Sequence, residues 1–256
     1  MKDCRDATSE FYIDTGSCLR LANAASPSGA VFLPSHFFAF KNQMLQVSIV
    51  PVTDFQQNCS IVFDDQTKNG VVVDPGGEVE KIAAAVSDLG VNVQAIWLTH
   101  GHLDHAGNAE AAKKQFDADI IGPHADDKML LDNIEIAALN YQLKGFFNAT
   151  PDRWLNGGDK LTIDEHEFEV RHCPGHAPGH VIFINHANKL ILMGDVLFQG
   201  SIGRTDLPGG NHQQLLNSIR DQVLTLDDDY RFLCGHSAPS TIGQERKTNP
   251  FLTDIV

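Results

Sequence analysis

An apolar run at residues 93–98 ends in a cluster of polar side chains, and this junction limits what the chain can fold into more than any other stretch. The cluster, Thr99-His100-Gly101-His102-Leu103-Asp104-His105, contains three histidines and one aspartate. A lone histidine is most often solvated or hydrogen-bonded, but four such side chains after a β-type run would be a costly way to end a strand. Neutral imidazole and carboxylate are the ligands that a borderline divalent ion such as zinc selects. We therefore predict a metal site where this strand ends.

Three later positions place the same ligand types beside glycine at the ends of predicted strands. His176 lies in a tight Cys-Pro-Gly-His loop, Asp195 follows an apolar run and a glycine, and His236 follows a Cys-Gly pair. Glycine allows the backbone to come close to a neighbouring group. Each of these three side chains is therefore a further candidate metal ligand.

Short β-rich runs, divided by turn residues, occupy both halves of the chain from residue 45 onward, with helical spacing between them. The order of β-rich, helical, β-rich and helical segments predicts an α/β fold of two packed sheets with helices outside. Residues 124–150, which include Tyr141, are expected to be partly helical and to form a lid or pocket wall. The expected strands are 45–52, 59–63, 70–73, 93–98, 118–121, 160–163, 167–172, 181–185, 190–193 and 230–233, and the expected helices are 79–89, 107–116 and 211–224.

The first part of the chain has a different character. Residues 1–43 show no sustained period, and we predict that they are an N-terminal extension, poorly ordered or outside the domain. The alternative is an added strand or helix that packs on the domain. Residues 44–256 are expected to form one folded domain, a length that can bury an ample core.

The charge balance narrows the class of partner. The sequence has 33 acidic and 19 basic residues, a formal net charge of −14. Such a surface does not suit the phosphate backbone of a nucleic acid, although bound divalent ions would make a pocket locally positive. No apolar run reaches the length of a membrane span. Five cysteines without paired spacing favour a reducing compartment, so we expect a cytoplasmic protein, and the charge does not exclude an anionic small molecule as its partner.

Together these residues resemble a known ligand set. The pattern His100-x-His102-x-Asp104-His105, followed by His176, Asp195 and His236, is similar to the dinuclear site of the metallo-β-lactamase superfamily, and the likeness runs from about Met44 to the C-terminus. The resemblance implies the four-layer αβ/βα sandwich of that family, with its metals at one edge of the sheets. It also implies two divalent ions, with zinc as the first choice and iron or manganese as alternatives.

The resemblance implies a role for each ligand. His100, His102 and His176 would bind the first ion, Asp104, His105 and His236 the second, and Asp195 would bridge them. Asp104 and Asp195 are the predicted catalytic residues, because a hydroxide bridging the two ions would be the nucleophile and Asp104 would help to orient it. Asp74 would be a buried support of the ligand loop. His172 and His180 have no ligand role, and we expect them to hydrogen-bond to neighbouring groups.

Three further stretches are similar to short, single-domain glyoxalase II-like hydrolases of bacteria, at residues 50–59, 194–206 and 241–252. This likeness implies hydrolysis of a thioester such as S-lactoylglutathione. Arg204 stands where that family has a lysine, so it is the predicted substrate-binding residue. The alternative for Arg204 is a loop residue paired with Asp206. Asp206 itself replaces an aromatic residue of the family, and most of the family's glutathione-binding groups are missing.

Other branches of the superfamily remain as alternatives. Persulfide dioxygenases, which use one iron ion, share Gly194-Asp195 and the stretch 203–206 but lack a Gly-His pair like Gly235-His236. A lactonase or esterase of the same fold would use the same hydroxide. Exported β-lactamases usually have a cysteine or a different arrangement in the second site, which does not fit Asp195 as a bridge.

Overall fold

The computed structural model of the chain describes residues 37–39 and 45–253. Strand β1 (Phe37–Ala39) falls within the predicted N-terminal extension and pairs antiparallel with β2 (Leu45–Val52). The rest of that extension lies outside the described residues, and the boundary at residue 44 stays a prediction.

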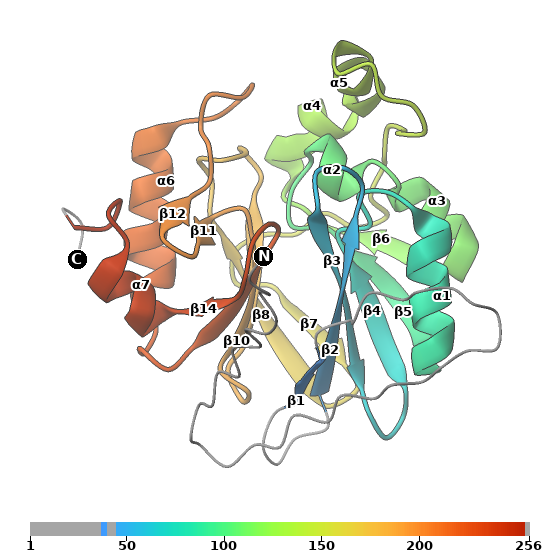
Figure 1. Cartoon of the computed structure of the whole chain (residues 1–256), viewed down its shortest axis with the longest axis horizontal. Helices are drawn as coiled ribbons and strands as arrows, with labels where there is room; N and C mark the ends of the chain where they lie inside the picture. The colour runs from blue at the N-terminus through green and yellow to red at the C-terminus, as the bar shows by residue number, and fades with distance from the viewer. Residues whose placement is uncertain (1–36, 40–44, 254–256) are drawn as a thin grey trace, which may run out of the picture. The chain divides into compact units, whose positions relative to one another are not determined.

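Two six-stranded sheets face each other at the centre of the domain, with helices on their outer faces (Figure 1). In the first sheet, β4 to β6 run parallel and the other neighbours antiparallel. In the second sheet only β10 and β13 are parallel. The first sheet has the order β1, β2, β3 (Gln57–Asp64), β4 (Asn69–Val73), β5 (Asn92–Trp97) and β6 (Asp119–Ile121); the second has the order β14 (Ser240–Thr241), β13 (Arg231–Cys234), β10 (Leu190–Gly194), β9 (Val181–Asn185), β8 (His166–His172) and β7 (Lys160–Ile163).

Helices cover the outer face of each sheet. Over the first sheet lie α1 (Val79–Leu89), α2 (Leu103–Ala106), α3 (Ala109–Phe116), the 3-10 helix η1 (Ala125–Asp127), α4 (Lys128–Leu131) and α5 (Ile134–Asn140). Over the second lie α6 (His212–Ser218), which continues as the π-helix η2 (Ile219–Val223), and α7 (Ile242–Thr248). The predicted α/β four-layer sandwich is confirmed.

The core between the sheets is apolar and closely packed. Trp97 of β5 is the largest side chain in it, and its ring lies 5.2 Å from Phe168 of β8 and 5.1 Å from Phe183 of β9. Each fully buried aromatic or aliphatic side chain of this kind stabilises the fold by about 1.5–3 kcal/mol. The outer faces of the strands are buried as well, for example by Ile82 of α1. This explains why the strands read as continuous apolar runs rather than as alternating ones.

The sheets are joined at the edge where β4, β5, β10 and β13 end. The backbone N–H of Asn58 donates to the carbonyl of Gly235 at 2.7 Å, and that of Val181 donates to the carbonyl of Thr99 at 2.8 Å. Because β4 runs parallel to β5, and β10 to β13, their carboxyl ends meet on this side. Side chains that follow these four strands are therefore brought together.

Two helices differ from the expectation. The predicted helix at 107–116 begins at Ala109, and α2 forms directly on the Asp-His stretch before it. Helix α7 was not predicted, because Ile242 is its only large apolar residue and the segment has no apolar stripe. In the described part of the chain, no helix is both long enough and apolar enough to cross a membrane.

Candidate metal centre

Seven side chains from both sheets converge at the joined edge, and they are the ones that the sequence predicted. The first sheet supplies those after β5, and the second supplies those after β8, β10 and β13. They form two groups of three whose ligand atoms lie within 4.8 Å of one another: His100, His102 and His176, and Asp104, His105 and His236. Asp195 lies between the groups. Their role as metal ligands stays a prediction.

The first group, which we call the histidine triad (His100, His102, His176), brings ring nitrogens close together. His176 Nε2 lies 2.9 Å from His102 Nδ1 and 3.2 Å from His100 Nε2. Tetrahedral zinc with Zn–N bonds of about 2.0–2.1 Å would hold two such nitrogens roughly 3.3 Å apart. The spacing of the triad thus suits one small cation.

The second group, which we call the mixed triad (Asp104, His105, His236), combines a carboxylate with two imidazoles. Asp104 Oδ2 lies 3.1 Å from His236 Nε2 and 4.0 Å from His105 Nε2. Gly235 allows this approach, because a Cβ there would lie 2.2 Å from Asp195 Oδ1 and 2.4 Å from the His105 ring. At Gly235, as expected, the absence of a side chain lets the end of β13 approach the neighbouring ligand residues.

Asp195 faces both triads with one carboxylate. Its Oδ2 lies 3.5 Å from His176 Nε2 and 3.6 Å from His236 Nε2, and its Oδ1 lies 3.5 Å from His105 Nε2. Two ligand atoms of the cluster, His105 Nε2 and Asp195 Oδ1, are buried without a hydrogen-bond partner. Buried polar atoms are costly unless something satisfies them. The donor set and these unpaired atoms therefore fit divalent cations.

In four of the histidines, the ring nitrogen that points away from the other candidate ligands, Nδ1, is hydrogen-bonded. His105 Nδ1 pairs with Asp74 Oδ2 at 2.9 Å. The other three pair with Thr99 Oγ1 (His100, 3.0 Å), the Arg204 carbonyl (His176, 2.8 Å) and the Phe55 carbonyl (His236, 3.2 Å). Such partners orient an imidazole and select the tautomer whose other nitrogen is free for a metal.

Asp74 supports the ligand loop in a backbone conformation with φ +53°. Its Oδ1 accepts a hydrogen bond from Thr99 N at 2.7 Å, and its Oδ2 accepts from Thr99 Oγ1 at 2.6 Å as well as from His105. One buried carboxylate therefore fixes both ends of the loop from Thr99 to His105.

The two histidines without a predicted ligand role are hydrogen-bonded. His180 is fully buried, stacks on His100 at 4.6 Å, and accepts a hydrogen bond at Nε2 from the Asp195 N–H at 3.0 Å. His172 Nε2 donates to the Pro178 carbonyl at 2.9 Å and its ring stacks on His124. Both side chains hold the loops that carry His176 and Asp195.

The two triads differ in charge. Burial, reinforced by the neighbouring imidazoles, lowers the pKa of His102 to about 3 and holds the pKa of His100 well below its usual range. In the mixed triad burial acts in the same direction, but carboxylates outweigh it: Asp195 and Asp104 raise the pKa of His105, and the Asp104 hydrogen bond raises the pKa of His236. The histidine triad is thus neutral and ready to bind a cation, whereas the mixed triad carries protons that a cation must displace.

Arg204 lies beside the cluster, but its guanidinium is occupied. Its Nε and Nη2 donate to the two oxygens of Asp206 at 2.8 and 2.7 Å, and both side chains are exposed. Only its carbonyl contacts a predicted ligand, His176. The predicted pairing with Asp206 is therefore present, and the substrate-binding role of Arg204 stays a prediction.

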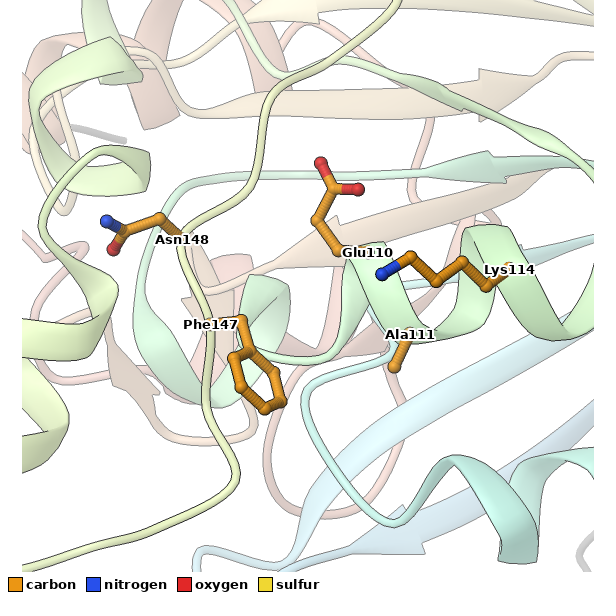
Figure 2. A pocket seen from close by; sticks show the side chains of 5 residues that line it. All are labelled: Glu110, Ala111, Lys114, Phe147 and Asn148. Atoms are coloured by element: carbon orange, nitrogen blue, oxygen red, sulfur yellow. The ribbon is translucent and has the colours of Figure 1, made fainter.

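Tyr141 of the predicted pocket wall lies at the rim of the site. Tyr141, at the end of α5, packs edge-on against Phe55 with ring centroids 6.5 Å apart, and the Phe55 carbonyl holds His236. A separate hollow of about 320 Å³ lies between α3 and the segment carrying Phe147 and Asn148 (Figure 2). Its other lining residues are Glu110, Ala111 and Lys114, so it includes none of the predicted site residues.

Sequence reasoning missed two side chains that support the cluster. Thr99 directly precedes His100, so its position beside the motif was an available signal. Asp127, which contacts the backbone at Gly101 and Gly179, offered no such signal, because it lies in a short helical segment next to another aspartate.

Comparison with known proteins identifies the family. The model of the metallo-beta-lactamase superfamily matches residues 52–236. The chain is 46% identical over 209 residues to the hydroxyacylglutathione hydrolase GloC of Haemophilus influenzae, an alignment covering 81% of this chain and 98% of that protein. Two solved structures, each 35% identical, match as well. BLEG-1 B3 metallo-beta-lactamase has a TM-score of 0.75 and covers 81% of this chain and 99% of its own. TTHA1623 in a di-iron-bound form has a TM-score of 0.73, with 80% and 99% covered.

The matched region contains all seven residues of the cluster. The ligand pattern, the two facing sheets and the sequence relatives agree with one another, and the chain belongs to the metallo-β-lactamase superfamily, as a metallo-hydrolase of the glyoxalase II-like kind.

Proposed function

We propose that this metallo-hydrolase cleaves a small-molecule thioester, such as S-lactoylglutathione, with two divalent cations held by the two triads. The observation that carries the proposal is the position of the Asp195 carboxylate, within 3.6 Å of histidines from both triads. The likeness to a hydroxyacylglutathione hydrolase over nearly its whole length supports the substrate class. Zinc suits the His and Asp donors, and iron or manganese are the alternatives.

Two divalent cations bound there would supply positive charge that polarises a carbonyl and makes water more acidic. His100, His102 and His176 would hold the first and Asp104, His105 and His236 the second, with Asp195 between them. The histidine triad needs no deprotonation at neutral pH, because the pKa of His102 is lowered to about 3. We therefore expect the first cation to be the more firmly bound.

Asp104 is the group that orients the attacking water in this proposal. Its Oδ2 lies 3.1 Å from His236 Nε2, within the mixed triad, so its Oδ1 would be the oxygen that accepts a hydrogen bond from water. Water oxygen attacks the thioester carbonyl carbon, the carbon–sulfur bond breaks, and the sulfur leaves with a proton as a free thiol. The products are the hydroxy acid and the thiol.

Arg204 is the proposed contact for an acidic group on the thiol half of the substrate. A guanidinium binds a carboxylate through two parallel hydrogen bonds, which is how Arg204 now binds Asp206. A substrate carboxylate would replace Asp206 in that pairing. The aromatic pair Phe55 and Tyr141 would line the same rim.

The proposal includes no nucleic-acid partner, because the net charge of −14 does not suit a phosphate backbone. It includes a cytoplasmic location, which the free and buried Cys59, Cys173 and Cys234 support without establishing. Burial raises the pKa of the Cys234 thiol to about 11, so this thiol is not a nucleophile at neutral pH.

The test is metal analysis of the purified protein together with a panel of thioester, lactone, β-lactam and persulfide substrates. We expect about two cations per chain and faster cleavage of S-lactoylglutathione than of β-lactams. Efficient β-lactam turnover without thioester cleavage would contradict the proposed substrate class. One iron per chain with oxygen uptake on persulfides would instead favour the dioxygenase alternative. The position of His236 in a complete second triad argues against that alternative.

A further inference from the structure

Asp127, the last residue of η1, is a fully buried carboxylate that belongs to neither triad. Its Oδ2 accepts a hydrogen bond from Gly101 N at 2.8 Å, and its Oδ1 accepts one from Gly179 N. Gly101 lies between His100 and His102, and Gly179 lies in the loop that carries His176. A single side chain therefore joins the two chain segments that supply the histidine triad.

The two glycines are pressed against the segment around Asp127. A Cβ at Gly101 would lie 2.9 Å from Leu130 Cβ and 3.2 Å from the Asp127 carbonyl oxygen. A Cβ at Gly179 would lie 2.5 Å from both Asp127 N and the His124 carbonyl oxygen. Any side chain at Gly179 would push the loop away from this segment. The absence of a Cβ at both positions is what lets one carboxylate reach both N–H groups.

Further backbone bonds fix the same arrangement. His124 N donates to the Gly179 carbonyl and Asp127 N donates to the His124 carbonyl, each at 3.0 Å. Gly179 is thus held at its N–H and at its carbonyl by a single short segment. On the other side of the two ligand loops, Val181 N donates to the Thr99 carbonyl at 2.8 Å. The loops are therefore fixed relative to each other at two separate points.

Burying this carboxylate is unfavourable in itself. Burial raises the pKa of Asp127 to about 7, and among residues 45–253 the structure shows no lysine, arginine or histidine paired with it. An apolar residue of similar size would avoid this cost but would leave two buried N–H groups without an acceptor. The carboxylate suits the position because it can accept both N–H groups at once.

We propose that Asp127 is a positioning residue, which holds the His100–His102 turn and the His176 loop at the spacing that one cation requires. It touches no predicted ligand side chain and acts through the two backbone N–H groups. This role rests on the proposed function, in which the histidine triad holds a cation. Its predicted consequence is that Asp127 sets the metal affinity of that triad.

The first experiment replaces Asp127 with asparagine, which keeps the shape but has only one acceptor oxygen. The amide NH₂ then faces one of the two backbone N–H groups. We expect one of the cation sites to bind Zn²⁺ about 10- to 100-fold more weakly, the usual effect of losing a group that orients a metal ligand. Metal-free protein is titrated with Zn²⁺ against a chromophoric chelator. The matched control is Asp132→Asn, because that side chain is 48% exposed and pairs with Lys128 instead of either glycine, and it should bind like the wild type.

A spectrum separates positioning from support of the fold. Co²⁺ in place of Zn²⁺ reports the geometry of its ligands through its visible absorption bands. Asp127→Asn should change these bands, whereas Asp132→Asn should leave them as in the wild type. A residue that only stabilised the fold would lower the melting temperature of the metal-free protein and leave the Co²⁺ spectrum of the folded variant unchanged.

A second measurement needs no variant and so remains valid if Asp127→Asn does not fold. In NMR spectra of the wild-type protein, the amide protons of Gly101 and Gly179 should exchange slowly with solvent and resonate downfield, because both donate to a carboxylate. Rapid exchange of both amides would overturn the proposal. So would a folded Asp127→Asn variant with wild-type affinity and spectrum. Wild-type protein that binds no cation would refute the proposed function and the metal role of Asp127 together, even if both amides were protected.

Discussion

The two triads are built from the same two sheets but provide different environments for a cation. The histidine triad contains three imidazoles, and burial keeps two of them well below their usual pKa. The mixed triad contains a carboxylate, and its His236 side chain is 30% exposed. Imidazole alone suits zinc, whereas a carboxylate also suits harder ions such as manganese. Under the proposed function, we expect the histidine triad to retain its cation more firmly and the mixed triad, whose His236 is partly exposed, to lie nearer the reacting water.

The largest effect is expected from removing the Asp195 carboxylate, because it faces both triads and its loss should therefore abolish the difference between them. Asp195→Ala should lower both metal content and kcat/KM, the latter by more than about 100-fold, because a direct ligand should matter more than the groups that orient it. Metal analysis and thioester kinetics measure the two effects. Asp221→Ala, which removes an exposed carboxylate paired with Arg220, is the control and should change neither. Full metal content with retained activity would show that Asp195 does not bridge.

Replacing one histidine in each triad tests the two proposed cation sites separately, with a smaller expected effect. His102→Ala should remove the cation of the histidine triad, and His236→Ala should remove only the cation of the mixed triad. Each variant is expected to retain about one metal per chain, and the one that remains in His236→Ala should be the more firmly bound. Chelator competition on both variants measures this. Equal affinities in the two variants would remove the proposed difference between the sites.

Proton release gives a smaller and more specific effect. The pKa of His105 is raised above its usual 6.5, so in metal-free protein it holds a proton at neutral pH, which a cation must displace. The pKa of His102 is lowered to about 3, so it releases none. Affinity of the mixed triad should therefore rise as the pH increases through neutrality, while the histidine triad keeps its cation at lower pH. Calorimetry at pH 7 in buffers of different ionisation enthalpy counts the protons. Equal release at both sites would contradict this difference.

The smallest expected effect lies at the rim. Arg204→Ala should raise the KM for S-lactoylglutathione by less than about 10-fold with little change in kcat, because an exposed ion pair contributes little. Asp206→Asn should act in the opposite direction, since it releases the guanidinium for the substrate. Steady-state kinetics on both variants test the proposal. An Arg204→Ala variant with unchanged KM would leave Arg204 as a residue that only pairs with Asp206.

The convergence of the seven candidate ligands was predictable because most of them carry a local signal. An imidazole or carboxylate at the end of an apolar run has few structural uses, and in a parallel-paired sheet the ends of such runs meet. The strands were predictable for a related reason, since both of their faces are buried and the runs are apolar throughout. The same reasoning drew attention to the loop of His176, whereas the role of Asp74 was implied only by the resemblance to the superfamily.

The residues that were missed depend on tertiary contacts. Nothing in Asp126-Asp127 indicates which carboxylate points inward, because the choice depends on where the loops at Gly101 and Gly179 arrive. Helix α7 has no apolar stripe, and a buried carboxylate, Glu245, fastens it to the hairpin of β11 (Leu197–Phe198) and β12 (Ser201–Ile202) through Gly200 N at 2.7 Å. Interactions of this kind arise only when distant segments meet.

Each triad takes its members from both sheets, with two from the loop after β5 and one from the second sheet. Neither half of the chain can therefore assemble a complete binding site alone. During synthesis on the ribosome, His100 to His105 emerge long before His236, so the proposed cations would be loaded late in maturation. A cation bound by both sheets would stabilise the packing of the two halves, and we expect its removal to weaken that packing before either sheet unfolds.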